Sequence, residues 1–309
     1  VLDPFWGEKG YISPAEYNRF CNSTVPLARM KKLIFTNNET FEAAVEVAHY
    51  GDGPIAACTP EWKIVDKSGK TIQSGTFSKT DIPLGNGFKL GDVSLPLSVI
   101  TSPEKLVLEV SVNGKSNSWD FWVYPATNEA ISGDENIRIV QKLDAQTTKF
   151  LKDGGSVLLN LKRGTLSKEM GGDVAIGFSS IFWNTAWTSG QAPHTFGILC
   201  NPNHPALADF PTEYHSNFQW WDAMSHSGAI NLTSFPADLK PIVRVIDDWV
   251  TNRPLALVFE GKLGKGKILI SGIDLTTDMD KRPEALQLLF SLKKYIAGGK
   301  FIPKVELTA

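Results

Sequence analysis

Hydrophobic and polar residues alternate along residues 33–125 with the two-residue period that is typical of half-buried β-strands. Gly-, Asn- and Ser-containing turn sequences separate these runs. The clearest runs and turns are Phe41-Ala43-Val45-Val47, Leu106-Leu108-Val110-Val112, Lys67-Ser68-Gly69-Lys70 and Asn113-Gly114. The pattern predicts an immunoglobulin-like β-sandwich that lacks the disulfide of antibody domains, with Trp62 in its core.

From residue 126 onward the pattern changes. Residues 126–135 form a polar connector, and residues 136–309 alternate apolar runs with helical patterns. A helix is expected from Asp144 to Lys152, and another from Pro283 to a stop at Gly298. The apolar face predicted for this second helix comprises Ala285, Leu286, Leu289, Phe290 and Ile296. Residues 126–309 are therefore predicted to be an α/β domain with a mostly parallel sheet and a hairpin near Gly264-Lys265-Gly266.

Residues 1–32 do not have the pattern of a complete domain. The sequence Ser13-Pro14-Ala15-Glu16 is a capping box with proline at the first helical position. The helix that follows is expected to carry Tyr17, Phe20 and Cys21 on one side and to end near Asn22. One short helix cannot bury its own apolar face, so these residues are expected to need a partner surface.

Residues 178–222 form a long aromatic-rich insertion in the α/β domain, which we call the aromatic segment. Indole rings give large contact areas, and sugars stack on them. The candidate sugar-binding residues are Trp183, Asn184, Trp187, His194, His215, Gln219, Trp220 and Trp221. A long ordered loop can bind a ligand or fill the space between domains, and the sequence leaves both interpretations open.

Composition excludes several classes of function. The net charge of −2 indicates no nucleic-acid partner, and no apolar run approaches the roughly 20 residues of a membrane span. Three widely separated cysteines indicate neither a disulfide framework nor a zinc site, so no metal and no cofactor are expected. Asp247, Asp248 and Asp274 are interpreted as solvated carboxylates at strand ends.

Two further motifs have the residues for chemistry without the surrounding structure that the chemistry needs. Gly261–Lys267 nearly matches a phosphate-binding loop, but a strand follows it where that loop requires a helix. Cys200, with Glu213 and His215, could form a nucleophilic site only on a strained glycine-flanked turn. The sequence around Cys200 has no such turn, so no residue is assigned a catalytic role.

The first 125 residues resemble a region of family 2 glycoside hydrolases, in particular bacterial β-galactosidase-like and β-glucuronidase-like members. LDPFWGEKGYISPAEYNRFCNSTVPLAR is similar to the last strand–helix unit of their catalytic barrel. Residues 33–125, including SWDFWVYP, are similar to the β-domain that follows this barrel. Residues 126–309 more loosely resemble the amidotransferase-like, flavodoxin-like or trimerisation-type α/β domains attached to some β-galactosidases.

This resemblance implies three regions: a barrel remnant (1–32), a sandwich (33–125) and an α/β domain (126–309). The catalytic glutamates of the family lie on earlier barrel strands, and no residue of this chain matches either of them. The expected function is therefore a non-catalytic accessory region of a hydrolase acting on β-glycosides. It would support the barrel, form subunit contacts or present substrate, and a carbohydrate-binding module is the alternative. The implied partners are the upstream barrel, a carbohydrate and further copies of the chain, in a periplasmic or secreted protein.

Overall fold

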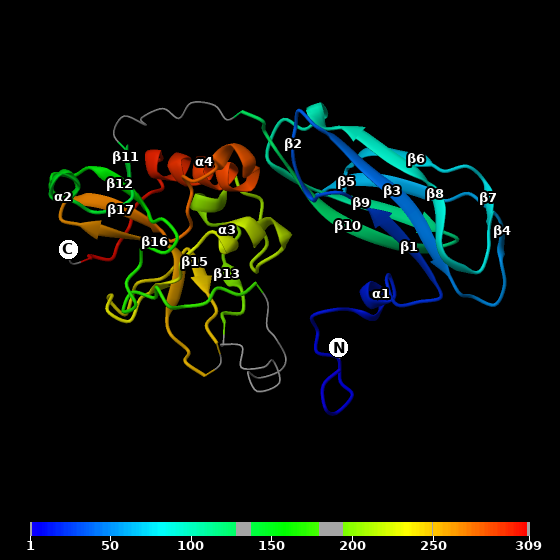
Figure 1. Cartoon of the computed structure of the whole chain (residues 1–309), viewed down its shortest axis with the longest axis horizontal. Helices are drawn as coiled ribbons and strands as arrows, with labels where there is room; N and C mark the ends of the chain where they lie inside the picture. Colours follow the sequence, from blue (N-terminus) through cyan, green and yellow to red (C-terminus); the bar gives the residue numbers. More distant parts are fainter. Residues whose placement is uncertain (1, 128–136, 179–193, 249, 308–309) are drawn as a thin grey trace. The chain divides into compact units, whose positions relative to one another are not determined.

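The computed structural model describes residues 2–127, 137–178, 194–248 and 250–307. The chain divides into two compact units, Val1–Ala126 and Thr127–Ala309 (Figure 1). The first unit consists mainly of β-strands, and the second combines a sheet with helices. The protein is therefore a β-rich multidomain chain, as the hydrophobic pattern predicts.

Two sheets pack face to face in the first unit. One has the strand order β1-β3-β8 and the other the order β2-β10-β9-β5-β6, with β4 and β7 paired beside them. Their bounds are β1 Thr24–Arg29, β2 Ile34–Thr36, β3 Thr40–His49, β4 Ile55–Cys58, β5 Glu61–Asp66, β6 Thr71–Thr76, β7 Thr80–Ile82, β8 Gly85–Pro96, β9 Glu104–Val112 and β10 Lys115–Tyr124. A short 3-10 helix, η1 (Leu97–Val99), connects β8 to β9.

The alternating apolar positions predicted from the sequence form the core between these sheets. Every alternating apolar residue of the two predicted runs, Phe41 to Val47 and Leu106 to Val112, is at most 2% exposed. The rings of Phe41 and Phe121 stack across the core with centroids 4.1 Å apart. Trp62 is only partly buried and packs against the edge of this core. The turn at Asn113-Gly114 has positive φ angles at both residues, which a tight two-residue hairpin requires.

The N-terminal residues differ from the predicted arrangement in two ways. Residues Thr24–Arg29, predicted to precede the sandwich, form strand β1 and pair along β3. Helix α1 spans only Pro14–Tyr17, although its capping box forms as expected. None of its residues is buried, so no tertiary packing extends the helix beyond one turn.

The second unit is built on a mixed sheet. The strand order is β11-β12-β17-β16-β15-β13, with β14 paired to β16. The bounds are β11 Ile137–Val140, β12 Ser156–Asn160, β13 Ile198–Cys200, β14 Ile230–Asn231, β15 Val243–Val245, β16 Leu255–Leu263 and β17 Gly266–Ser271. Strands β11, β12 and β17 are parallel, whereas β16, β15 and β13 are antiparallel. The prediction of a mostly parallel sheet is therefore wrong, because β15 and β13 continue the sheet beyond the predicted Gly264 hairpin with further antiparallel pairings.

Helices pack against this sheet at the predicted places. Helix α2 spans Ala145–Lys152 with Asp144 as its N-cap, and α4 spans Pro283–Ala297 and ends at Gly298. Shorter helices are α3 (Trp221–Ser225), η3 (Pro205–Leu207), η4 (Phe218–Trp220) and η5 (Met279–Lys281). Within the described residues, no helix has the length and apolarity to cross a membrane.

The buried face of α4 differs from the predicted one. Ala285 and Ile296 are buried as predicted, and Leu288 and Leu292 are also fully buried, whereas the predicted residues Leu286, Leu289 and Phe290 are partly exposed. Polar side chains on the buried face explain the difference. Ser291 donates to Ala206 O at 2.8 Å, and Gln287 donates to Asp209 O at 2.7 Å. These tertiary hydrogen bonds, together with the burial of Leu288 and Leu292, fix which side of α4 faces inward.

Candidate functional site

Backbone hydrogen bonds join residues 175 and 177, just before the aromatic segment, to residues 195 and 197 within it. Thr195 N donates to Ala175 O at 3.0 Å, and Gly197 N donates to Gly177 O at 3.1 Å. A Cβ at Gly177 would lie 2.0 Å from His194 Nδ1, so glycine is required for this close approach. The candidates Trp183, Asn184 and Trp187 lie outside the described residues. His194 directly precedes Thr195 in this paired backbone, and the other described candidates follow it in the chain.

Two of the candidate residues belong to the core of the second unit. Trp220 is 0% exposed, its ring meets Phe210 edge-on at 5.2 Å, and its Nε1 donates to Thr212 Oγ1 at 2.8 Å. Gln219 is also fully buried. Neither residue presents a surface to solvent, so both depart from the predicted sugar-binding role. Their burial shows that the segment is partly a packing element.

The neighbouring aromatic residues point outward. Trp221 is 54% exposed, Phe218 47% and Tyr214 62%. The Trp221 ring lies 5.4 Å from that of Phe178, so the two ends of the aromatic segment meet there. His215 is exposed and pairs through its backbone with Leu199 at the edge of the sheet. We call Tyr214, His215, Phe218 and Trp221 the exposed aromatic surface; the rings of Tyr214 and His215 lie 4.7 Å apart with their planes at 66°.

The candidate histidine His194 makes local contacts. Its Nδ1 lies 2.7 Å from Thr195 O, and its ring lies edge-on to Phe196 at 6.3 Å. It is partly buried beside the paired backbone rather than grouped with the exposed aromatic residues. The structure therefore gives it a role in shaping the base of the segment.

Cys200 is held in a form that is poorly suited to nucleophilic attack. Its Sγ donates to Glu213 O at 3.2 Å. Burial, together with the nearby charge of Glu213, raises the pKa of the Cys200 thiol to about 11. A catalytic thiol needs the opposite shift, because the thiolate is the nucleophile. The Glu213 side chain is engaged with the Asn217 amide, so it does not serve as a base for this thiol.

Three carboxylates of the second unit were predicted to be solvated, and that prediction is wrong because all three are buried. Asp247, Asp248 and Asp274 are 7%, 3% and 6% exposed. Burial raises the pKa of Asp247, but hydrogen bonds from Arg253 lower it more, and the net pKa lies below its usual value. Asp274 accepts from Thr276 and Thr277. Among the described residues, no group of three or more His, Cys, Asp or Glu side chains could hold a metal ion.

Exposed aromatic residues also gather near the N-terminus. Phe5 is 89% exposed, Trp6 83%, Tyr11 66% and Phe20 54%, and we call these four the N-terminal aromatic surface. Asp3 organises the loop that carries the first two. Its Oδ1 accepts from Phe5 N at 2.8 Å and from Gly7 N at 2.7 Å. Trp6 has a φ of 65°, a conformation that non-glycine residues adopt only where surrounding contacts hold it.

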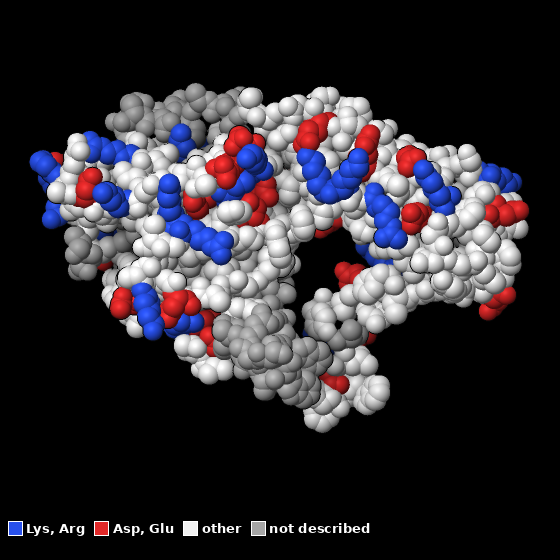
Figure 2. All heavy atoms as spheres, viewed as in Figure 1, with Lys and Arg blue, Asp and Glu red and all other residues white. Residues whose placement is uncertain are grey.

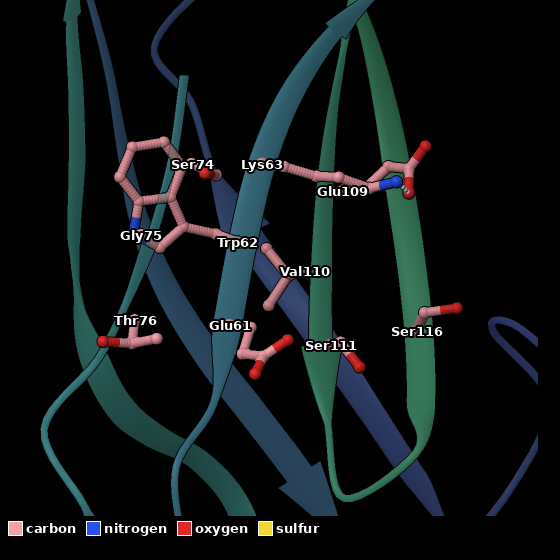
Figure 3. A pocket seen from close by; sticks show the side chains of 10 residues that line it. All are labelled: Glu61, Trp62, Lys63, Ser74, Gly75, Thr76, Glu109, Val110, Ser111 and Ser116. Carbon is pink, nitrogen blue, oxygen red and sulfur yellow. Dashed lines mark ion pairs between the residues drawn. The ribbon is translucent and has the colours of Figure 1, made fainter. Parts of the chain in front are cut away.

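A polar hollow of about 290 Å³ crosses strands β6, β5, β9 and β10 of the sandwich (Figure 3). Lys63 and Glu109 reach toward each other there and form an ion pair of 3.0 Å. Gly75 leaves room for the Trp62 ring, because a Cβ there would lie 2.9 Å from the indole. The remaining polar side chains that line the hollow are Glu61, Ser74, Thr76, Ser111 and Ser116.

Sequence reasoning missed this hollow. Its polar side chains come from four strands and occupy ordinary outward positions of the alternating pattern. Only strand pairing brings them side by side. The ion pair is about half-exposed, so it contributes little to stability. On the face of the molecule seen in Figure 2, basic and acidic side chains are intermixed, without a patch of a single sign.

Comparison with solved structures finds weak similarity between parts of this chain and parts of other proteins. An alkylpurine DNA glycosylase of Pseudomonas fluorescens has 13% identity and a TM-score of 0.27, covering 33% of this chain and 30% of that chain. The sporulation control protein Spo0M of Bacillus subtilis has 15% identity and a TM-score of 0.25, covering 33% and 50%. A β-glucuronidase of Parabacteroides merdae has 12% identity and a TM-score of 0.24, covering 44% and 21%.

The chain thus spans at most half the length of each of these proteins, and such low TM-scores carry no functional conclusion. A search of curated proteins gave no match. Family models match both units. The model described as "Domain of unknown function (DUF8488)" matches residues 39–125, within the sandwich. The model described as "Domain of unknown function (DUF8487)" matches residues 138–309, which is more than half of the chain, and the protein therefore belongs to that family.

Proposed function

We propose that this chain is a non-catalytic accessory region of a glycoside hydrolase acting on β-glycosides. It would dock against the catalytic barrel through the N-terminal aromatic surface. The observation that carries the proposal is the exposure of Phe5 and Trp6, at 89% and 83%, in residues whose sequence resembles the last strand–helix unit of such a barrel. Large exposed apolar side chains that lie close together mark interaction sites.

The structure of the loop that carries Phe5 and Trp6 supports a docking role for these two residues. The Asp3 carboxylate and a backbone bridge between Leu2 and Glu8 close the loop that carries Phe5 and Trp6. A closed loop loses less conformational entropy when a partner binds it, so its aromatic side chains are prepared for contact. Phe20 of this surface packs edge-on against the ring of Tyr17 at 5.2 Å, which extends the apolar surface to Tyr17.

In this proposal the two units have different roles. The first is interpreted as an immunoglobulin-like sandwich that carries the docking segment at its start. The second is interpreted as an amidotransferase-like or flavodoxin-like domain without catalytic function. Its β11-α2-β12 unit has the parallel β-α-β order of such domains. The raised pKa of Cys200 supports a non-catalytic role.

The test uses the upstream catalytic barrel, expressed as a separate polypeptide. Titration calorimetry measures its affinity for the full chain, and p-nitrophenyl β-glucuronide and β-galactoside measure hydrolysis. The double variant Phe5→Ser/Trp6→Ser is expected to weaken binding at least about tenfold, because buried aromatic anchors dominate interface energies. Tyr50→Ser is the matched control, since Tyr50 is 66% exposed but lies on the sandwich.

Two results would contradict the proposal. The first is hydrolysis of either substrate by this chain alone. The second is a barrel that does not bind the chain, or that binds the double variant as tightly as the unmodified protein.

A carbohydrate-binding module is the second candidate, favoured by the exposed aromatic surface of Tyr214, His215, Phe218 and Trp221. Sugars stack on exposed indole and phenol rings. Titrating tryptophan fluorescence with β-linked oligosaccharides tests this candidate. A saturable change that Trp221→Ala abolishes and Trp220→Phe retains would support it. No response to any oligosaccharide would leave the segment as a packing element.

A further inference from the structure

Two parallel strands of the second unit end side by side. Asn160, the last residue of β12, pairs in register with Ser271, the last residue of β17. The chain continues from β12 into residues 161–178. Beyond β17, Gly272 O accepts from Gly228 N at 2.9 Å, so residues 227–228 lie over the same sheet edge. In open α/β sheets, ligands bind outside the carboxyl ends of parallel strands.

A cavity of about 420 Å³ lies between these two segments. This volume is within the range of small-molecule sites. Glycines allow its walls to approach closely. A Cβ on Gly171 would lie 2.2 Å from Ala229 O, and one on Gly172 would lie 2.2 Å from Leu166 O. Backbone groups therefore line much of the cavity, together with the side chains of Ser225 and Ser227.

The charge of the cavity wall indicates which ligand it fits. Among the described residues that line it, Arg163 has the one ionised side chain, and no carboxylate is present. Arg163 is exposed and forms no ion pair with any residue of the described part of the chain. A guanidinium with free donors pairs with carboxylate or phosphate groups in a two-pronged geometry. The cavity thus combines small-molecule size with an arginine that has no ion-pair partner among the described residues.

We propose that this cavity binds a small anionic ligand, up to about the size of a sugar acid or sugar phosphate. Arg163 pairs with the carboxylate or phosphate group, and the exposed Ser225 hydroxyl hydrogen-bonds to the rest of the ligand. The residues that line the cavity include none of the N-terminal aromatic surface and none of the exposed residues Tyr214, His215, Phe218 and Trp221. Failure of either proposed function would therefore leave this inference standing.

Titration calorimetry of the full chain at low salt tests the site with three probes: sodium D-glucuronate, D-glucose 6-phosphate and neutral D-glucose. At least one of the two anions is expected to bind saturably. Neutral D-glucose is expected not to bind. Arg163→Gln is expected to weaken anion binding about tenfold or more, as the loss of a charged hydrogen bond does. Ala175→Glu, which places a carboxylate on the exposed wall, is expected to abolish binding.

Arg244→Gln is the matched control, because Arg244 is an exposed arginine that lines a different cavity. It is expected to bind the anion as the unmodified chain does. Arg163 and Ala175 are both exposed, so circular dichroism should show both variants folded, and Arg163→Gln alone decides the question if Ala175→Glu unfolds. The response to glucuronate or to the phosphate identifies the anionic group. Absence of binding by both anions, equal binding of D-glucose, or unchanged binding by Arg163→Gln would overturn the proposal.

Discussion

Replacing Arg282 with methionine tests whether a buried charge network holds the aromatic segment to α4. The Arg282 side chain is 6% exposed and lies just before the helix. Its Nε donates to Asp222 at 2.8 Å, and its Nη1 donates to Asp274 O at 2.8 Å and to Thr277 O at 2.9 Å. Asp222 directly follows Trp221, so one side chain joins three separate segments.

The expected loss follows from what methionine leaves behind. Asp222, whose side chain is 13% exposed, keeps its charge and loses its guanidinium partner, while two backbone carbonyls lose a donor. Removing one partner of a buried pair costs about 3–5 kcal/mol, much of it from the uncompensated charge. His226 Nδ1, 3.1 Å from Asp222, offsets part of this cost where the histidine is protonated. We therefore expect Arg282→Met to lower the free energy of unfolding by about 3–5 kcal/mol at pH 7.

Urea denaturation, followed by circular dichroism and tryptophan emission, measures this change. Arg244→Met is the control, and it should alter stability by less than about 0.5 kcal/mol because Arg244 is exposed. Asp222→Asn combined with Arg282→Met should recover part of the loss, since the buried charge is then absent. A loss below about 1 kcal/mol for Arg282→Met, or no recovery in the double variant, would refute the network.

Three further predictions use the same two units. Trp220→Ala should lower the free energy of unfolding by about 3–5 kcal/mol because Trp220 is fully buried, whereas Trp221→Ala should cost less than about 1 kcal/mol; equal losses in urea denaturation would contradict this. Cys21 should react with a thiol reagent at pH 8 far faster than Cys200, whose pKa of about 11 leaves roughly a thousandth of it as thiolate; comparable rates by mass spectrometry would contradict the assignment. Burial and nearby Asp222 raise the pKa of Glu284 from 4.5 to about 6, so the contribution of Glu284 to stability is present below pH 4.5 and is lost as pH rises through 6. Glu284→Gln should therefore stabilise the protein by about 2 kcal/mol at pH 8 and have little effect at pH 4, as urea midpoints at both pH values would show.

Local signals in the sequence predicted the elements that depend on neighbouring residues. The capping box at Ser13 forms, Asp144 caps α2, and Gly298 ends α4, because each signal acts within one or two helical turns. The alternating runs of the sandwich form its core, because a strand with one apolar face has one favourable orientation. The predicted hairpin at Gly264 forms as well, because glycine-containing turn residues are also a local signal.

The candidate site was predicted less well, since composition does not say which aromatic residue is buried. Trp220 and Trp221 are adjacent and chemically identical, yet the first is fully buried and the second is 54% exposed. The direction of η4 and α3, which Asn217 and the Asp222–Arg282 pair help to set, makes that difference. Trp183 and Trp187 lie outside the described residues, so their proposed sugar contacts stay predictions.

The sequence by itself determined the β-rich organisation, the turns at Asn113-Gly114 and Gly264, the end of α4, and the absence of a local motif around Cys200 for nucleophilic chemistry. These features follow from periodicity and from interactions between near neighbours. Only the tertiary structure decided the mixed direction of the second sheet, the buried side of α4 and the place of Arg163 beside a cavity. Each of these depends on contacts between residues far apart in the chain, which no local pattern encodes.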